Sequence, residues 1–147
     1  MHVHKPIPLQ IGQYASGVAT IAGWIGLVLA PLDLHIYSIA GTPVGGREFV
    51  AGVGWAFGPA VIAAGVVAYG LVRNRAWSRP AMLGFWPIIA LYAALDARHG
   101  PGGAAMAMMQ GGSVLIAGVV AGIYLYRNRA AATYFESLDE TTDRGTR

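Results

Sequence analysis

The amino-acid sequence predicts an all-α integral membrane protein, folded as a bundle of four transmembrane helices. The first indication is composition, because 55% of the 147 residues are hydrophobic and only 12% are charged. Soluble domains carry about 25% charged residues, so the solvent for much of this chain must be lipid. The second indication is a set of four long uncharged runs, and the third is a pair of arginine-rich blocks that directly follow two of those runs.

The chain is predicted to be a single membrane domain, residues 1–147, with a short cytoplasmic N-terminus. Pro6 and Pro8 predict that residues 1–13 form no regular helix, since proline removes a backbone donor. The first span is expected at about residues 14–34, where no charge occurs before the aspartate near its end. About 20 apolar residues in a helix are enough to cross the roughly 30 Å of a bilayer's hydrocarbon core.

Three further spans are expected at about residues 49–72, 80–96 and 104–126. Glycine and proline residues between the first two spans predict a loop at residues 35–48. The third span is the shortest and contains Pro87, so a full crossing and a tilted or re-entrant segment both stay open. Charged residues beyond Ala130 predict a cytoplasmic C-terminal tail.

The basic residues predict the orientation of the bundle. With both termini on one side, that side holds eight of the ten basic residues, namely Lys5, Arg73, Arg75, Arg79, Arg127, Arg129, Arg144 and Arg147. The opposite side holds Arg47 and Arg98. Because cytoplasmic loops are rich in lysine and arginine, this bias predicts a multi-pass protein with cytoplasmic termini, as in a bacterial inner membrane.

A short block occurs twice, at the ends of the second and fourth spans. Leu71 and Leu125 are each followed, one residue later, by Arg-Asn-Arg-Ala, at an offset of 54 positions. One interpretation is a duplicated two-helix hairpin with parallel copies, since internal repeats are common in membrane proteins. The other interpretation is that two helices that leave the membrane on the same side need similar residues at their ends, without any duplication.

Small residues on the second and fourth spans predict close helix packing. Gly54 and Gly58 are four residues apart, as are Gly118 and Gly122, so each pair shares one face of a helix. Such faces let another backbone approach closely. We therefore expect leucine at Gly58 or Gly118 to disrupt packing, either within the chain or against a partner subunit.

Polar residues gather where the first and third spans end on the outer side. Asp33, His35, Asp96 and His99 are the candidate ligands for a divalent metal, and His35 and His99 could alternatively ligate a haem or a pigment. We favour a simpler interpretation without metal or cofactor, in which charged residues collect where the lipid ends and Asp96 pairs with Arg98 or Arg47.

The sequence also narrows the function by what it lacks. The central parts of the four spans contain no ionisable residue, whereas ion-coupled transporters keep one there. No catalytic or nucleotide-binding motif occurs, and the absence of cysteine excludes thiolate metal sites. The net charge of +3 is explained by topology, so no nucleic-acid partner is expected.

These observations favour a non-catalytic accessory or scaffold subunit of a larger membrane complex, of a respiratory or photosynthetic kind. Its expected partners are the lipid bilayer and either other membrane subunits or further copies of itself. The alternative is a small homo-oligomeric transporter or channel. A third class, a haem-, pigment- or metal-binding membrane protein or enzyme, would use His35 and His99.

Overall fold

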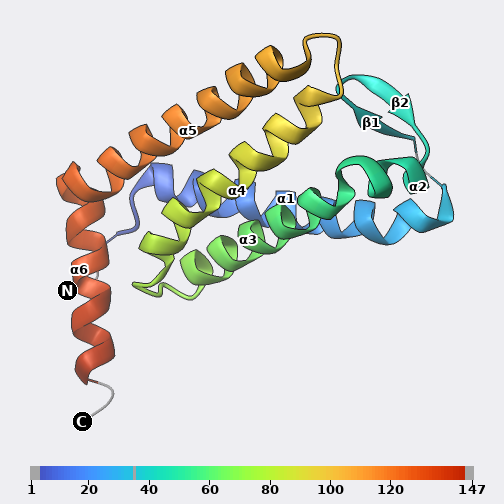
Figure 1. Ribbon diagram of the computed structural model, residues 1–147. Helices are drawn as coiled ribbons and strands as arrows, with labels where there is room; N and C mark the ends of the chain where they lie inside the picture. The colour runs from blue at the N-terminus through green and yellow to red at the C-terminus, as the bar shows by residue number, and fades with distance from the viewer. Residues whose placement is uncertain (1–3, 35, 145–147) are drawn as a thin grey trace.

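Long helices dominate the structure, and the two chain termini lie on the same side of the molecule (Figure 1). The computed structural model describes residues 4–34 and 36–144, with side chains described as far as Leu138. Within these residues, four helical stretches are long and apolar enough to cross a membrane, namely Ile7–Leu32, Gly46–Val72, Ser78–Arg98 and Gly103–Arg127. The prediction of a mostly helical fold with four apolar helices of spanning length is confirmed.

The first stretch starts earlier than expected. It consists of α1 (Ile7–Leu29) and a 3-10 turn, η1 (Ala30–Leu32). The prediction that Pro6 and Pro8 keep residues 1–13 from forming a helix was wrong. Pro6 lies just before the helix and Pro8 lies in its first turn, where backbone N–H groups have no partner within the helix and proline costs little.

The second and third stretches both tolerate an internal proline. The second comprises α2 (Gly46–Phe49), a π-helical turn η2 (Val50–Gly54) and α3 (Trp55–Val72), which contains Pro59. The third is α4 (Ser78–Arg98), which continues through Pro87 without a break. Its 21 residues give a length of about 31 Å, which matches the hydrocarbon core. The structure therefore has a full-length helix where the sequence left a re-entrant segment open.

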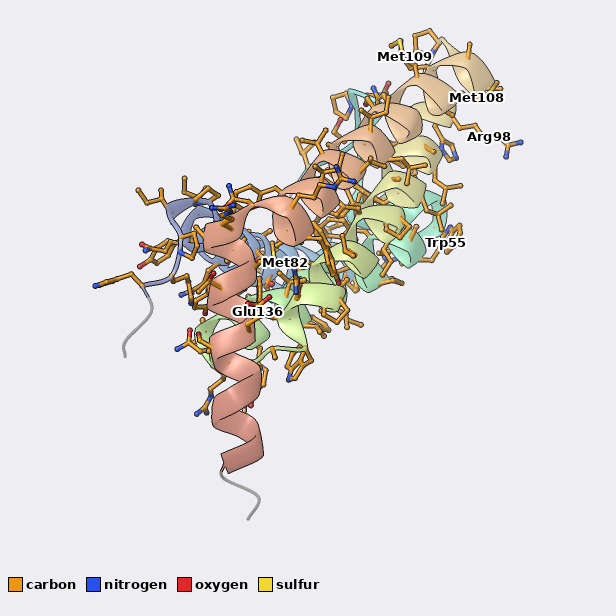
Figure 2. All side chains as sticks on the ribbon, turned by 90° about the vertical axis from the view of Figure 1, so that its left-hand side faces the viewer. Trp55, Met82, Arg98, Met108, Met109 and Glu136 are labelled. Carbon is orange, nitrogen blue, oxygen red and sulfur yellow. The ribbon has the colours of Figure 1, made fainter. Side chains whose placement is uncertain are left out.

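The four long helices pack in series. Extensive contacts join α1 to α3, α3 to α4, and α4 to α5 (Gly103–Arg127), so α1 and α5 form the two edges. Figure 2 shows Arg98, Met108 and Met109 at the end of this assembly opposite the C-terminal helix α6 (Arg129–Arg144), which carries Glu136. Much of the apolar surface of α1 and α5 faces outward, as expected where lipid replaces water.

The contact between α4 and α5 depends on glycine. A Cβ atom added at Gly118 would lie 2.7 Å from the Cβ of Trp86, and one at Gly122 would lie 3.2 Å from a methyl carbon of Leu83. Gly111 lies one helical heptad before Gly118 and would similarly meet Ala94 at 3.0 Å. These glycines share one face of α5, so the two backbones approach closely along most of their length.

The predicted glycine pair of the second span lies differently. Gly54 is buried in the π-helical turn, where an added Cβ would meet the Phe49 carbonyl oxygen of its own stretch at 3.3 Å. A Cβ at Gly58 would have nothing within 4 Å. The close approach of α1 to α3 instead uses Gly23, whose added Cβ would collide with Val61 of α3.

A β-hairpin joins the first two stretches. Strands β1 (Tyr37–Ile39) and β2 (Thr42–Val44) pair antiparallel across a turn in which Ala40 and Gly41 both have positive φ. This conformation belongs to the tight turns that suit the twist of a hairpin. Its strands pack on an apolar cluster at this end of the helices, built around Phe49 and Val53. The predicted loop at residues 35–48 is thus partly regular structure.

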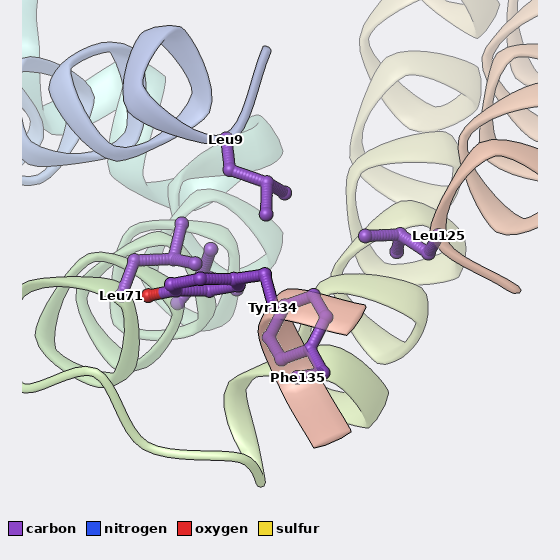
Figure 3. Close-up of a cluster of buried hydrophobic side chains, with 6 residues drawn as sticks. Leu9, Leu71, Leu125, Tyr134 and Phe135 are labelled. Carbon is purple, nitrogen blue, oxygen red and sulfur yellow. The ribbon is translucent and has the colours of Figure 1, made fainter. Parts of the chain in front are cut away.

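A second apolar cluster closes the opposite end and includes the C-terminal helix. Leu9, Leu71, Leu125, Tyr134 and Phe135 bring together α1, α3, α5 and α6 (Figure 3). The sequence predicted a tail beyond Ala130 but no packed helix there. Full burial of each large side chain stabilises the fold by about 1.5–3 kcal/mol, so α6 is held as part of the core.

We predict that Gly118→Leu lowers the melting temperature of the detergent-solubilised protein, at an overpacking cost of about 1–3 kcal/mol. The reason is the short distance to Trp86, which leaves no room for a side chain. Gly58→Leu is the matched control, because a Cβ added there would have nothing within 4 Å. The structure thus reverses the expectation from sequence for Gly58, and equal losses at both positions would contradict it.

Candidate functional site

Asp33 binds backbone at the start of the second helical stretch. One oxygen, Oδ1, accepts hydrogen bonds from the N–H groups of Gly46 at 2.6 Å and Arg47 at 3.3 Å. The second oxygen lies 3.9 Å from Nε of Arg47. A carboxylate in this position satisfies free donors of the first helical turn and interacts favourably with the helix dipole. Asp33 therefore acts as a cap supplied from another part of the chain.

Gly46 makes this capping arrangement possible. A Cβ atom at this position would collide with the carbonyl oxygen of Ala30, so only glycine lets η1 and α2 come this close. Asp33 itself adopts a left-handed conformation with φ of 51°, which aspartate tolerates better than most residues. From sequence, Gly45 and Gly46 predicted only a loop.

Asp96 fixes the hairpin to the third helix. Its Oδ1 atom accepts the N–H of Ala40 at 3.1 Å, at the positive-φ turn. The pairing of Asp96 with Arg98 or Arg47 that we expected does not form within the part of the chain that the structure describes. Arg47 lies beside Asp33 instead, and Arg98 is exposed.

His99 lies in the exposed turn after α4, and its Nδ1 is 2.8 Å from the Leu95 carbonyl oxygen of the same helix. His35 lies outside the described residues. Among the described side chains of residues 4–34 and 36–138, no group of three or more histidine, aspartate or glutamate residues is placed to hold a metal ion. Asp33 and Asp96, the two carboxylates of the candidate cluster, are each hydrogen-bonded to a different part of the backbone.

The opposite end of the molecule carries the repeated arginine blocks, and there two cations bind the backbone at equivalent positions. Nζ of Lys5 donates to the Leu71 carbonyl oxygen at 2.5 Å, and Nη2 of Arg79 donates to that of Leu125 at 2.7 Å. In each case the carbonyl belongs to the last turn of a long helix, where it has no partner within that helix. A cation there also interacts favourably with the helix dipole.

The two asparagines of the repeat end their helices in different ways. Asn74 adopts a left-handed conformation with φ of 49°. Two backbone hydrogen bonds, from the Arg75 N–H to the Gly70 carbonyl oxygen and from the Asn74 N–H to the Leu71 carbonyl oxygen, complete a Schellman motif. Asn128 is extended, and its side-chain oxygen accepts the N–H of Ala131 at 3.3 Å. The first block therefore stops a helix, whereas the second starts α6.

A polar cavity of about 480 Å³ opens beside the first block. It is lined by His4, Lys5, Gln10, Gln13, Tyr14, Asn74 and Tyr134. The Tyr134 hydroxyl donates to Oδ1 of Asn74 at 2.8 Å, and burial raises the pKa of this phenol, which keeps it neutral. No sequence pattern predicted this cavity, and Lys5, the only lysine in the chain, was interpreted only as part of the basic bias.

Apolar grooves run along the helices. One of about 460 Å³ lies between α3 and α4, where Ala63, Ala81 and Gly84 provide its small positions. A second, of about 410 Å³, lies between α4 and α5 around Ala90, Gly111 and Gly112. Grooves between membrane helices are places where a further helix or a lipid chain can pack.

The comparisons with known proteins are negative. No protein-family model matches the chain, and the searches of curated proteins and of solved structures found no match.

We predict that Asp96→Ala lowers the free energy of unfolding by about 1–3 kcal/mol, the usual cost of leaving a half-buried donor without its partner. The Ala40 N–H loses its acceptor, and the hairpin loses its attachment to α4. Thermal unfolding in detergent measures the effect, with Glu48→Ala as a control at an exposed charge near the same end. A loss no larger than that of the control would contradict this role.

Proposed function

We propose that this chain is a non-catalytic accessory or scaffold subunit of a larger membrane protein complex. The observation that carries the proposal is the groove between α3 and α4, which is apolar and contains a glycine, Gly84, that the chain's own packing does not require. A Cβ at Gly84 in the groove, or at nearby Gly58, would have nothing within 4 Å. Glycine in a helix interior costs about 1 kcal/mol relative to alanine, so an open glycine face favours a use outside this chain.

The occupant that best fits the groove is a transmembrane helix of another subunit. Small residues let a partner backbone come close, and close packing is the main attraction between helices in lipid, where the hydrophobic effect is lost. The rest of the groove consists of larger apolar side chains such as Ile62, Phe85 and Ile88, which would interlock with the side chains of a partner helix.

We further propose that the end carrying both termini faces the cytoplasm, in a bacterial inner membrane. Support comes from the basic residues, since the start of α1, the turn after α3 and the junction of α5 and α6 lie at this end (Figure 1) and carry Lys5, Arg73, Arg75, Arg127 and Arg129. The interpretation as a duplicated hairpin gains support from the equivalent bonds of Lys5 to Leu71 and of Arg79 to Leu125. In both hairpins, a cation near the start of the first helix caps the end of the second.

We predict that Gly84→Leu releases the partner helix, because the new side chain fills the groove. After mild detergent extraction, native mass spectrometry should find the wild-type chain in a complex with a different subunit and the variant chain alone. Gly17→Leu on α1 is the matched control, since it adds the same atoms in open space outside the groove.

Two outcomes would overturn this proposal. A wild-type complex that contains only copies of this chain would favour the homo-oligomeric transporter or channel. A wild-type chain extracted alone, with only lipid bound, would remove the scaffold role.

We predict that a single cysteine at Ser38 reacts with an impermeant maleimide added to intact cells, whereas one at Ala130 reacts only after lysis. Both residues are exposed and lie at opposite ends of the helices, and the native chain has no cysteine that would interfere. The reverse labelling pattern would invert the proposed orientation.

A further inference from the structure

We propose that the polar cavity at the basic end binds the phosphate group of an anionic phospholipid, with Lys5 as its charged contact. This cavity lies between the start of α1, the turn after α3, and α6, and residues of all three line it. The inference rests on the proposed membrane location but is independent of the accessory-subunit role.

The positive charge of Lys5 is not neutralised by its hydrogen-bond partners. Its ammonium group donates to Oε1 of Gln13 at 2.6 Å and to the Leu71 carbonyl oxygen at 2.5 Å, and both acceptors are neutral. No carboxylate within ion-pair distance of Lys5 occurs among the side chains described up to Leu138. An ammonium group has three N–H donors, so one remains for a ligand.

Two amide oxygens of the cavity, those of Gln13 and Asn74, already accept hydrogen bonds, whereas Gln10 uses its NH₂ group on the Lys5 carbonyl oxygen at 2.8 Å. Oε1 of Gln13 accepts from Lys5, and Oδ1 of Asn74 accepts from the Tyr134 hydroxyl at 2.8 Å. Both side chains therefore keep their NH₂ groups, which are donors only, for other partners. A cavity that presents a cation together with amide donors matches the acceptor oxygens of a phosphate.

The ammonium group of Lys5 is partly removed from water. Burial lowers the pKa of the Lys5 ammonium from its ordinary value, because the charged form loses water there. An anion in the cavity would restore favourable electrostatics without any change in the fold. The ammonium also lies over the Tyr134 ring, 6.0 Å from the ring centroid, which is a favourable position for a cation.

The exposed apolar residues near the cavity favour a lipid as the source of the phosphate. The cavity meets the outward apolar surface of α1 at its first turns, where Ile7 and Ile11 are more than half exposed. A headgroup in the cavity would leave its acyl chains beside these residues, at the depth where polar and apolar surfaces meet. Free phosphate would gain nothing from that apolar surface.

The test is native mass spectrometry of the full chain in detergent, titrated separately with phosphatidylglycerol, phosphatidylcholine and inorganic phosphate. We expect the wild type to retain phosphatidylglycerol at least ten times more tightly than phosphatidylcholine. Gln13→Glu should abolish that preference, because the new carboxylate keeps the bond to Lys5, neutralises it and repels the phosphate. This variant should stay folded, whereas Lys5→Met also removes the cap on Leu71 and is the less clean variant.

Arg75→Met is the matched control, since it removes one positive charge from the same end without touching the cavity. It should retain the preference for phosphatidylglycerol. Equal retention of that lipid by Gln13→Glu and the wild type would overturn the proposal, as would equal binding of the two lipids by the wild type. Inorganic phosphate bound as tightly as phosphatidylglycerol would overturn the assignment to a lipid. Loss of a partner subunit in Gly84→Leu, with lipid still bound, would separate this site from the scaffold role.

Discussion

The structure depends on one constraint, namely that backbone groups at the ends of long helices have no partner within the helix and must find one elsewhere. Three charged side chains meet it from other parts of the sequence, and a fourth binds the hairpin turn. Lys5 and Arg79 bind carbonyl oxygens at the ends of α3 and α5, while Asp33 and Asp96 bind N–H groups at the start of α2 and in the hairpin turn. Lys5 and Arg79 thus lie at helix C-termini and Asp33 lies at a helix N-terminus, which is the placement that the helix dipole favours.

This constraint also explains what could be predicted from the sequence. Membrane-spanning length follows from uncharged runs, and the boundaries at Arg73 and Arg127 follow from charge, because both properties belong to single helices. The roles of Asp33 and Asp96 could not be predicted in the same way. Each aspartate bonds to backbone that is 13 or 56 positions away, and a sequence pattern carries no information about such pairings. Both lie near helix ends, as expected, but the expected partner of Asp96 was an arginine, and a backbone partner was expected for neither aspartate.

Other differences have local causes that the sequence does contain. Ala131, Tyr134, Phe135 and Leu138 recur at helical spacing, a pattern that indicates an amphipathic helix and that the charged residues of α6 obscured. Of the glycine pairs, Gly118 and Gly122 lie against α4, whereas Gly58 faces open space, although their spacing is identical. Spacing shows that two glycines share a face, but only the packing of the whole chain decides which neighbour that face meets.

The repeated Arg-Asn-Arg block shows how one motif can build two different structures that then meet. After α3, Asn74 accepts a left-handed conformation and ends the helix, so its side chain is free to face α6. After α5, Asn128 caps a new helix whose second turn carries Tyr134. The Tyr134 hydroxyl donates back to Asn74, and these two residues line the cavity beside Lys5. The cavity thus needs the left-handed stop at Asn74 and the helix α6 that starts only after the second block.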